Sequence, residues 1–404
     1  MIDNWLDTNF QKLVEIRRWL HRHPEVGFKE HETSQYCKKL MCDLGLDIYQ
    51  NDEMKTGFYC DYGNGNGPTI AVRCDLDALP IQEINKVDYC SLNSGVSHAC
   101  GHDAHLTNIL GLASFMVESN INIPGKVRFL FQPAEEIAPG GAVVMIDAGA
   151  IEGVDHIIGG HILPSLSPEK IGIRYGAMAA AVEQIDVTLN GPGGHTSRPA
   201  ESVDLIWAQS HLVISLEESL KHHLDQRERV VLAFGSVEGG HTGNVLPDEI
   251  KMEGTLRYLN MELENKLTKI IDNTIHAVEQ LTGAKITWSI PYAAPGLIND
   301  NKCTELVIKA ANDILGEENV VLMEESSMGG EDFAYYLEKI PGAYFRIGCN
   351  DGKTRDIHTN DFNLDEHCIA TAIKVFSESI SQYFSLHKIT NLGSKPSFQI
   401  KAGN

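Results

Sequence analysis

The sequence has no run of apolar residues that approaches the ~20 required for a transmembrane helix. It also has no excess of basic residues, because 33 Lys and Arg stand against 55 Asp and Glu and give a formal net charge of −22. Such an acidic chain is poorly suited to bind nucleic-acid phosphates or anionic membranes, so we expect no nucleic acid and no membrane as a partner. Its nine cysteines are odd in number and lack the spacing of a small disulfide-bonded domain.

The first residues, MIDNWLDTNFQKL, carry acids where a secretory signal peptide would have a basic segment and an apolar run. Together with the scattered cysteines, this predicts a cytoplasmic protein with reduced thiols. The hydrophobic content of 43% favours a folded chain, and the length of 404 residues suggests two or three domains. The oligomeric state is open between a monomer and a homo-oligomer.

Short apolar runs alternate with longer helical patterns in the first part of the chain and again after Pro295. This alternation is typical of βαβ units on a mainly parallel sheet. A helix at 106–117 has the apolar spacing expected for packing on that sheet. The expected buried strands are 69–72, 126–131, 156–160 and 343–348.

The middle third of the chain has a different pattern, with the order β-α-β-β-α-β. The expected strands are 182–190, 230–237, 249–259 and 284–292, and the helices lie near 202–220 and 261–281. This order is that of the ferredoxin-like fold, which normally makes a self-contained domain. We therefore predict an α/β fold in which residues 1–181 and 294–404 form a mainly parallel-sheet domain, with an α+β domain, residues 182–293, inserted in it.

Polar and ionisable residues stand directly after the carboxyl ends of several expected strands. In an open α/β sheet, ligands bind beyond the carboxyl ends of the strands. Carboxylate, imidazole and thiolate groups are ligands for zinc and neighbouring transition metals, so the sequence predicts a metal site at this edge. The residues placed there are Asp75, Asp77, Cys100, His102, Glu135, Glu136, His161 and His358.

Each of these residues has a simpler interpretation when it is taken alone. A single cysteine such as Cys100 is an inert core residue about as often as it is a metal ligand. Two adjacent glutamates are more often a solvated charged pair than part of a site. The convergence of several such groups at equivalent strand ends favours the metal site. Consecutive residues at a strand end point in opposite directions, so one of Glu135 and Glu136 can bind metal while the other accepts a proton from water.

A series of motifs in this order resembles the M20 metallopeptidases. The most similar branch contains amidohydrolases that act on N-acyl amino acids: hippurate hydrolases, indole-acetyl-amino-acid hydrolases and N-acetyl-amino-acid deacetylases. The resemblance runs from HRHPEVGFKE to about residue 370 and implies a metal-binding α/β domain with an inserted lid. The motifs are RCDLDALP, HACGHDAH, FQPAEE, GGHILP, GPGGHTSRP, NVLPDEIKMEGTLR, SMGGEDFA and IHTNDF.

The resemblance implies a centre of two divalent transition-metal ions, with zinc, manganese, cobalt or nickel as candidates. Cys100 stands between the ions, where other M20 peptidases use an aspartate, and Glu135 matches the general base. Asp75 stands where classical M20 enzymes have a histidine ligand, and we do not count Asp75 as a metal ligand. Asp77 is expected to orient a residue next to the metal ligands. The implied ligands are Cys100, His102, Glu136, His161 and His358.

The resemblance also implies that the inserted domain binds substrate and closes for catalysis. His195 would donate to the oxygen that gains negative charge, and Asn244 and Arg257 would hold the substrate carboxylate. On the residues alone, a histidine such as His195 in a glycine-rich loop is more often simply exposed. Arg257 is nearly as often a surface strand residue in an ion pair. Cys74 stands where this branch usually has alanine, which leaves the substrate preference open.

The function that this resemblance implies is hydrolysis of the amide bond in N-acyl amino acids, with acetyl, benzoyl or aryl-acetyl groups as candidates. The metal ions would polarise the carbonyl and acidify a water, and Glu135 would carry its proton to the leaving amine. Two alternatives remain open. One is a dipeptidase or aminoacylase-like peptidase of the same family, and the other is a non-catalytic homologue that only binds a ligand.

Overall fold

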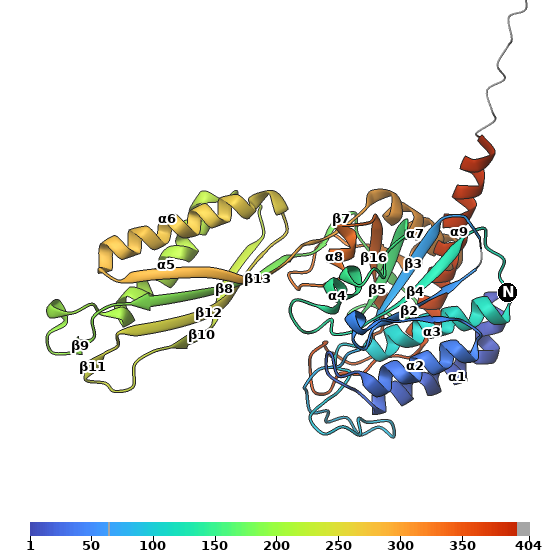
Figure 1. The fold of residues 1–404 in the computed structure, drawn as a ribbon, viewed down its shortest axis with the longest axis horizontal. Coiled ribbons are helices and arrows are strands. Elements are labelled where there is room, and N and C mark those ends of the chain that lie inside the picture. Colours follow the sequence, from blue (N-terminus) through green and yellow to red (C-terminus); the bar gives the residue numbers. More distant parts are fainter. Residues whose placement is uncertain (64, 394–404) are drawn as a thin grey trace, which may run out of the picture. The chain divides into compact units, whose positions relative to one another are not determined.

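The computed structural model describes residues 1–63 and 65–393 of the chain. These residues form two compact units (Figure 1). The larger unit comprises Met1–Gly176, Asn299–Glu324 and the chain from Tyr335, and the smaller comprises Ala177–Ile298 and Glu325–Ala334. The smaller unit is thus assembled from two stretches of chain, of which the second lies outside the range 182–293 expected for the inserted domain.

The larger unit is built on a sheet whose central strands are parallel. Its strands are β1 (Ile48–Tyr49), β2 (Phe58–Tyr62), β3 (Thr69–Asp75), β4 (Lys126–Gln132), β5 (His156–Leu163), β6 (Ile171–Ile173), β15 (Val320–Leu322) and β16 (Gly342–Gly348). They form an eight-stranded sheet in the order β1-β2-β4-β3-β5-β16-β6-β15. The pairs β4–β3, β3–β5 and β5–β16 are parallel, whereas β1, β2 and β6 add antiparallel pairs. The predicted α/β class with a mainly parallel sheet is confirmed.

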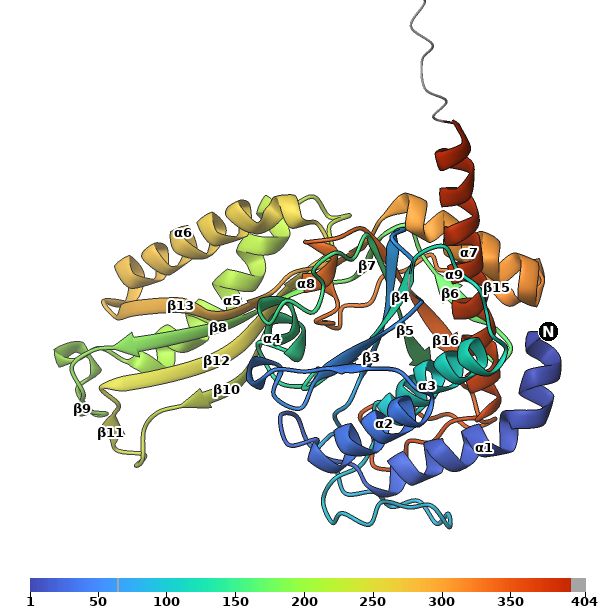
Figure 2. The same ribbon diagram turned by 45° about the vertical axis from the view of Figure 1, so that its right-hand side comes forward.

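Helices cover this sheet and bury its apolar strands. They are α1 (Ile2–Arg22), α2 (His31–Asp43), α3 (His102–Glu118), α4 (Gly141–Asp147), α7 (Asn301–Leu315), α8 (Ala334–Leu337) and α9 (His367–Gly393). Helix α3 contacts α1, α2 and α9 as well as β3 (Figure 2). All residues of β3 are buried, as a parallel strand covered on both faces should be. The core includes Val72, Ile109, Phe129, Phe345 and Phe376.

The smaller unit has the βαββαβ order that the sequence predicts. It contains β8 (Ala181–Asn190), α5 (Leu205–His223), β10 (Val230–Glu238), β12 (Glu249–Tyr258), α6 (Glu264–Thr282) and β13 (Lys285–Ala294). The strands form an antiparallel sheet in the order β10-β12-β8-β13. Two short strands, β9 (Gly194–His195) and β11 (Val245–Leu246), pair separately, as do β7 (Gly176–Ala179) and β14 (Leu297–Asn299).

Alternation along β8 separates the two faces of this sheet. Ile185, Val187 and Leu189 are buried in a cluster with residues of α5 and α6, while the intervening side chains are partly exposed. A half-buried antiparallel strand is expected to alternate in this way. Arg257 pairs with the partly exposed Val182, so its side chain lies on the open face of the sheet. Among the residues that the structure describes, no helix has the length and apolar character to span a bilayer.

Candidate metal centre

The chain is bent at the start of α3 so that Cys100 and His102 can face the same strand end. Gly101 lies between them with φ of 80°, in the left-handed region that glycine adopts readily. A Cβ atom on Gly101 would lie only 2.7 Å from Cγ1 of Ile162, the residue after His161. This contact shows that a glycine is needed to pack α3 against the end of β5.

One group of candidate ligands combines Cys100, His102 and His161, whose ligand atoms all lie within 4.8 Å of one another. All three residues are buried. The Sγ atom of Cys100 lies 3.2 Å from Nε2 of His161. Nδ1 of His102 is 2.9 Å from the Asp77 carbonyl, and Nδ1 of His161 is 2.8 Å from the Ile162 carbonyl. Because these carbonyls accept a hydrogen bond from the N–H at Nδ1, each neutral imidazole presents an unprotonated Nε2 to the centre of the group.

A second group combines Cys100, Glu136 and His358. Nε2 of His358 lies 3.3 Å from Sγ of Cys100 and 3.2 Å from Oε1 of Glu136. The backbone of His358 has φ of 62°, which is unusual for a residue other than glycine. Its N–H donates to the Ala99 carbonyl at 2.8 Å, which joins the His358 loop to the segment that carries Cys100.

The two groups share the sulfur of Cys100, an arrangement that fits two cations with a thiolate between them. Nε2 of His102 is buried and makes no hydrogen bond within the part of the chain that the structure describes. Burying such an atom without a partner costs free energy, which a cation at this position would recover. Burial also raises the pKa of the Cys100 thiol well above its ordinary value. A cation beside the sulfur would favour the thiolate over the thiol.

Glu135 belongs to neither of the groups that contain Cys100, but its carboxylate lies within 4.8 Å of ligand atoms of His102 and Glu136. Its Oε2 atom is 3.9 Å from Nε2 of His102, and its side chain is 11% exposed. The turn after β4 separates the two glutamates: Ala134 has φ of 45° and donates its N–H to Glu30 at 2.8 Å. The N–H of Glu136 donates to Oδ2 of Asp77 at 2.9 Å. Asp77 therefore contacts two candidate ligands: Glu136 through its carboxylate and His102 through its backbone carbonyl.

Asp75 lies behind the ligands and joins three elements of the larger unit. Its carboxylate accepts from Nδ1 of His105 at 2.8 Å and forms an ion pair with Arg73 at 2.6 Å. Nε2 of His105 accepts from the N–H of Ile162 at 3.0 Å. This chain of contacts supports the strand end that carries His161. The sequence placed Asp75 at the site, but the orientation of His105 depends on where α3 begins and could not be predicted.

In the smaller unit, His195 and Asn244 lie on the paired segments around β9 and β11. His195 pairs with Val245, and the carbonyl of Asn244 accepts from the N–H of Thr196 at 3.3 Å. Nδ1 of His195 accepts from the N–H of Ser197 at 3.1 Å and lies 2.8 Å from its Oγ. The neutral ring therefore carries its proton on Nε2, where it can be donated. Ser197 escaped the sequence reasoning because its contact with His195 depends on the turn between them.

Arg257 lies on the open face of β12, apart from the β9–β11 pair. Nη1 of Arg257 donates to the Met328 carbonyl at 2.9 Å, and Nε lies 3.4 Å from Oγ1 of Thr255. Met328 belongs to the second stretch of the smaller unit, Glu325–Ala334. The guanidinium thus binds a backbone carbonyl. The sequence alone had left open an ion pair with a carboxylate on the surface.

Comparison with known proteins places these observations among hydrolases. The model of "Peptidase family M20/M25/M40" matches residues 71–382. An N-acetyl-L-cysteine deacetylase and an N-acetylcysteine deacetylase of Bacillus subtilis (strain 168) are 37% and 35% identical, over 93% and 91% of this chain and 88% and 95% of theirs. The crystal structure of the Bacillus subtilis YXEP protein, described as a dinuclear metal binding peptidase from M20 family, aligns with a TM-score of 0.81 and 32% identity. The alignment covers 94% of this chain and 99% of that one.

Proposed function

The chain belongs to peptidase family M20/M25/M40 and is an amidohydrolase, and we propose that it hydrolyses N-acyl amino acids to a carboxylic acid and a free amino acid. The observation that carries this proposal is the pair of ligand groups around Cys100 with Glu135 alongside. The two Bacillus subtilis relatives named as deacetylases of N-acetylcysteine support an acylated amino acid as substrate. The acyl groups proposed are acetyl, benzoyl and aryl-acetyl.

We propose two divalent ions as cofactors, chosen from zinc, manganese, cobalt and nickel. Imidazole, thiolate and carboxylate donors suit all of these metals. When bound, the ions would supply Lewis acidity to the scissile carbonyl and to water. The relative described as a dinuclear metal binding peptidase supports the number of ions. The proposed ligands are Cys100, His102, Glu136, His161 and His358.

Glu135 is the proposed general base. It accepts a proton from the attacking water and then gives that proton to the nitrogen of the leaving amino acid. A base needs its carboxylate close to the reacting water without being consumed as a ligand. Its position beside His102, outside both groups that contain Cys100, supports this role. The contact of Asp77 with the N–H of Glu136 would keep the turn in the shape that separates the two carboxylates.

We propose that three residues of the smaller unit contact the substrate. His195 would donate its Nε2 proton to the carbonyl oxygen as that oxygen gains negative charge. Arg257 would bind the carboxylate of the amino-acid part through two parallel hydrogen bonds, and Asn244 would add a third donor. The bond from Arg257 to the Met328 carbonyl supports this role because it fixes the guanidinium without neutralising its charge.

A dipeptidase activity is the second candidate, and the description of the YXEP protein as a peptidase favours it. The two functions are separated by measuring kcat/KM for matched substrates that share one amino acid: its acetyl, benzoyl and aryl-acetyl derivatives and a dipeptide. The enzyme is first reconstituted with each candidate metal in turn. We expect acyl amino acids to be preferred. A preference for the dipeptide would support the peptidase instead, and no hydrolysis of any substrate with metals bound would contradict both.

A further inference from the structure

His358 occupies a strained position in a loop that has no regular secondary structure. The loop connects β16 with α9, and His358 has φ of 62° within it. A residue other than glycine adopts this region only at a cost in free energy, so surrounding contacts must hold it there. Its imidazole is at the same time one of the proposed ligands, with Nε2 at 3.2 Å from Glu136. The contacts that hold the loop therefore affect how well this ligand is placed.

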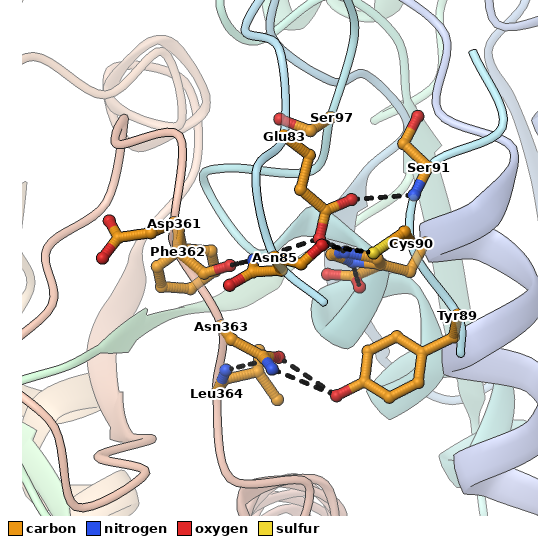
Figure 3. A network of polar contacts seen from close by, with 12 residues as sticks. Glu83, Asn85, Tyr89, Cys90, Ser91, Ser97, Asp361, Phe362, Asn363 and Leu364 are labelled. Atoms are coloured by element: carbon orange, nitrogen blue, oxygen red, sulfur yellow. Dashed lines mark hydrogen bonds and ion pairs between the residues drawn. The ribbon is translucent and has the colours of Figure 1, made fainter. Parts of the chain in front are cut away.

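The side chain of Asn85 contacts the loop on both sides of His358. Its Nδ2 donates to the Phe362 carbonyl at 2.8 Å (Figure 3), and its Oδ1 accepts from Nη1 of Arg355 at 2.9 Å. Arg355 precedes His358 in the chain and Phe362 follows it. Nη1 of Arg355 also donates to the Asp361 carbonyl. One amide group thus joins the beginning and the end of the segment that carries the ligand.

Glu83 fixes the orientation of this amide. Nδ2 of Asn85 donates to Oε1 of Glu83 at 3.0 Å, and Oε2 of Glu83 accepts from the N–H of Ser91 at 2.7 Å (Figure 3). Since Nδ2 faces two acceptors and Oδ1 faces a guanidinium, only one orientation of the amide satisfies its partners. The N–H of Ile84 adds a backbone hydrogen bond to the Asn360 carbonyl at 2.9 Å. The segment 83–91 therefore forms a support for the His358 loop.

We propose that Asn85 is a positioning residue that holds His358 in reach of the second ion, the one shared by Cys100, Glu136 and His358. This inference rests on the proposed function, because it presupposes two ions. Asn85 itself offers no ligand to them. Loss of its amide leaves Arg355 and Phe362 without their common partner, which frees the strained loop to relax away from Cys100. The first ion, held by Cys100, His102 and His161, does not depend on that loop.

The test measures the binding of Co²⁺ to the full-length wild type and to Asn85→Ala, by titration, elemental analysis and the absorption of the cobalt–thiolate bond. Removing a partner that supports a metal ligand typically weakens binding by about 10–100-fold. We expect this weakening for the second ion only. Asn93→Ala is the matched control, since Asn93 lies in the same loop but donates to the Pro24 carbonyl at 2.8 Å. It should bind both ions like the wild type.

Further variants separate positioning from a general loss of structure. Asn85→Asp has nearly the same volume and keeps the acceptor for Arg355, but it cannot donate to Phe362, so it should show the same loss even if the alanine variant does not fold. His358→Ala should remove the second ion, and adding Asn85→Ala to it should leave the affinity of the first ion unchanged. Equal weakening of both ions, or two ions bound as tightly as in the wild type, would overturn the inference. A wild type that binds fewer than two ions would contradict the proposed function, and the inference with it.

Discussion

The Sγ atom of Cys100 lies 3.2 Å from Nε2 of His161, although Cys100 stands just before α3 and His161 near the end of β5. A similar distance, 3.3 Å, separates the same sulfur from Nε2 of His358. The sulfur is the one ligand atom that two groups have in common: the group with His102 and His161, and the group with Glu136 and His358. Cys100 is therefore the residue on which the proposed binding of both ions depends.

Replacing Cys100 by alanine should release most of both ions during dialysis, because each group loses a ligand. Cys100→Asp should retain more metal, since a carboxylate can also bridge two cations. Metal content per chain, measured by elemental analysis, checks both expectations. Cys42→Ala is the control because Cys42 is an exposed thiol outside the site. Two ions retained by Cys100→Ala would contradict the shared thiolate.

Ser197→Ala should lower kcat/KM through its effect on His195. The variant loses the Oγ contact with Nδ1 of His195 at 2.8 Å. It keeps the hydrogen bond from the backbone N–H of residue 197 to the same nitrogen, because alanine has that N–H too. A single hydrogen bond contributes about 1 kcal/mol, which corresponds to about a fivefold decrease. His195→Ala should cost about 10²–10³-fold, as expected for an oxyanion donor. If Ser197 acts through His195, Ser197→Ala should cause no further decrease in the His195→Ala background, and a fivefold decrease there would argue against this link.

The buried ion pair of Arg17 and Asp103 should contribute strongly to the stability of the larger unit. Nε of Arg17 lies 2.7 Å from Oδ2 of Asp103, and neither side chain is exposed. Arg17→Leu leaves a buried carboxylate without its guanidinium, which typically costs about 3–5 kcal/mol. Urea unfolding, followed by a probe in the larger unit, measures this loss. Lys39→Ala, which breaks an exposed pair with Asp43, should change the free energy of unfolding by less than about 1 kcal/mol.

The strands that dominate the fold were predictable because a buried parallel strand leaves a continuous apolar run in the sequence, as in β3 and β4. The proposed ligands were found because parallel strands end at one edge, so His161 and Glu136 follow runs that could be recognised. The short strands β1, β6 and β15 have too few residues to show a period. Asn85 and Arg355 could not be predicted, because their contact brings together two loops that are distant in the sequence.

Glu183 should make the stability of the smaller unit depend on pH. Its side chain is buried under the helices and accepts from the Tyr258 hydroxyl at 2.7 Å. Burial raises the pKa of Glu183 above its ordinary value of 4.5. The folded state therefore binds this proton more tightly than the unfolded state, and the stability that results is present below pH ~4.5 and lost as the pH rises through the folded pKa.

Glu183→Gln tests this dependence, because the amide stays neutral and keeps an acceptor for Tyr258. We expect the variant to be more stable than the wild type at pH 7. The difference should shrink as the pH falls through the raised pKa of Glu183 and should level off below its ordinary value of 4.5. Denaturant unfolding at several pH values gives the two curves. A difference that does not change with pH would show that Glu183 does not titrate with folding.

The most direct test of the proposed mechanism is to measure turnover and metal content together in Glu135→Gln. The amide cannot accept the proton of water, and loss of a general base typically costs about 10²–10⁴-fold in rate. Glu118→Gln, a change at the end of α3 opposite to His102, serves as the control and should behave like the wild type. We predict that Glu135→Gln binds two ions per chain and loses nearly all hydrolysis of an N-acetyl amino acid. Wild-type turnover by this variant, or the loss of an ion from it, would contradict the role of Glu135 as an unligated base.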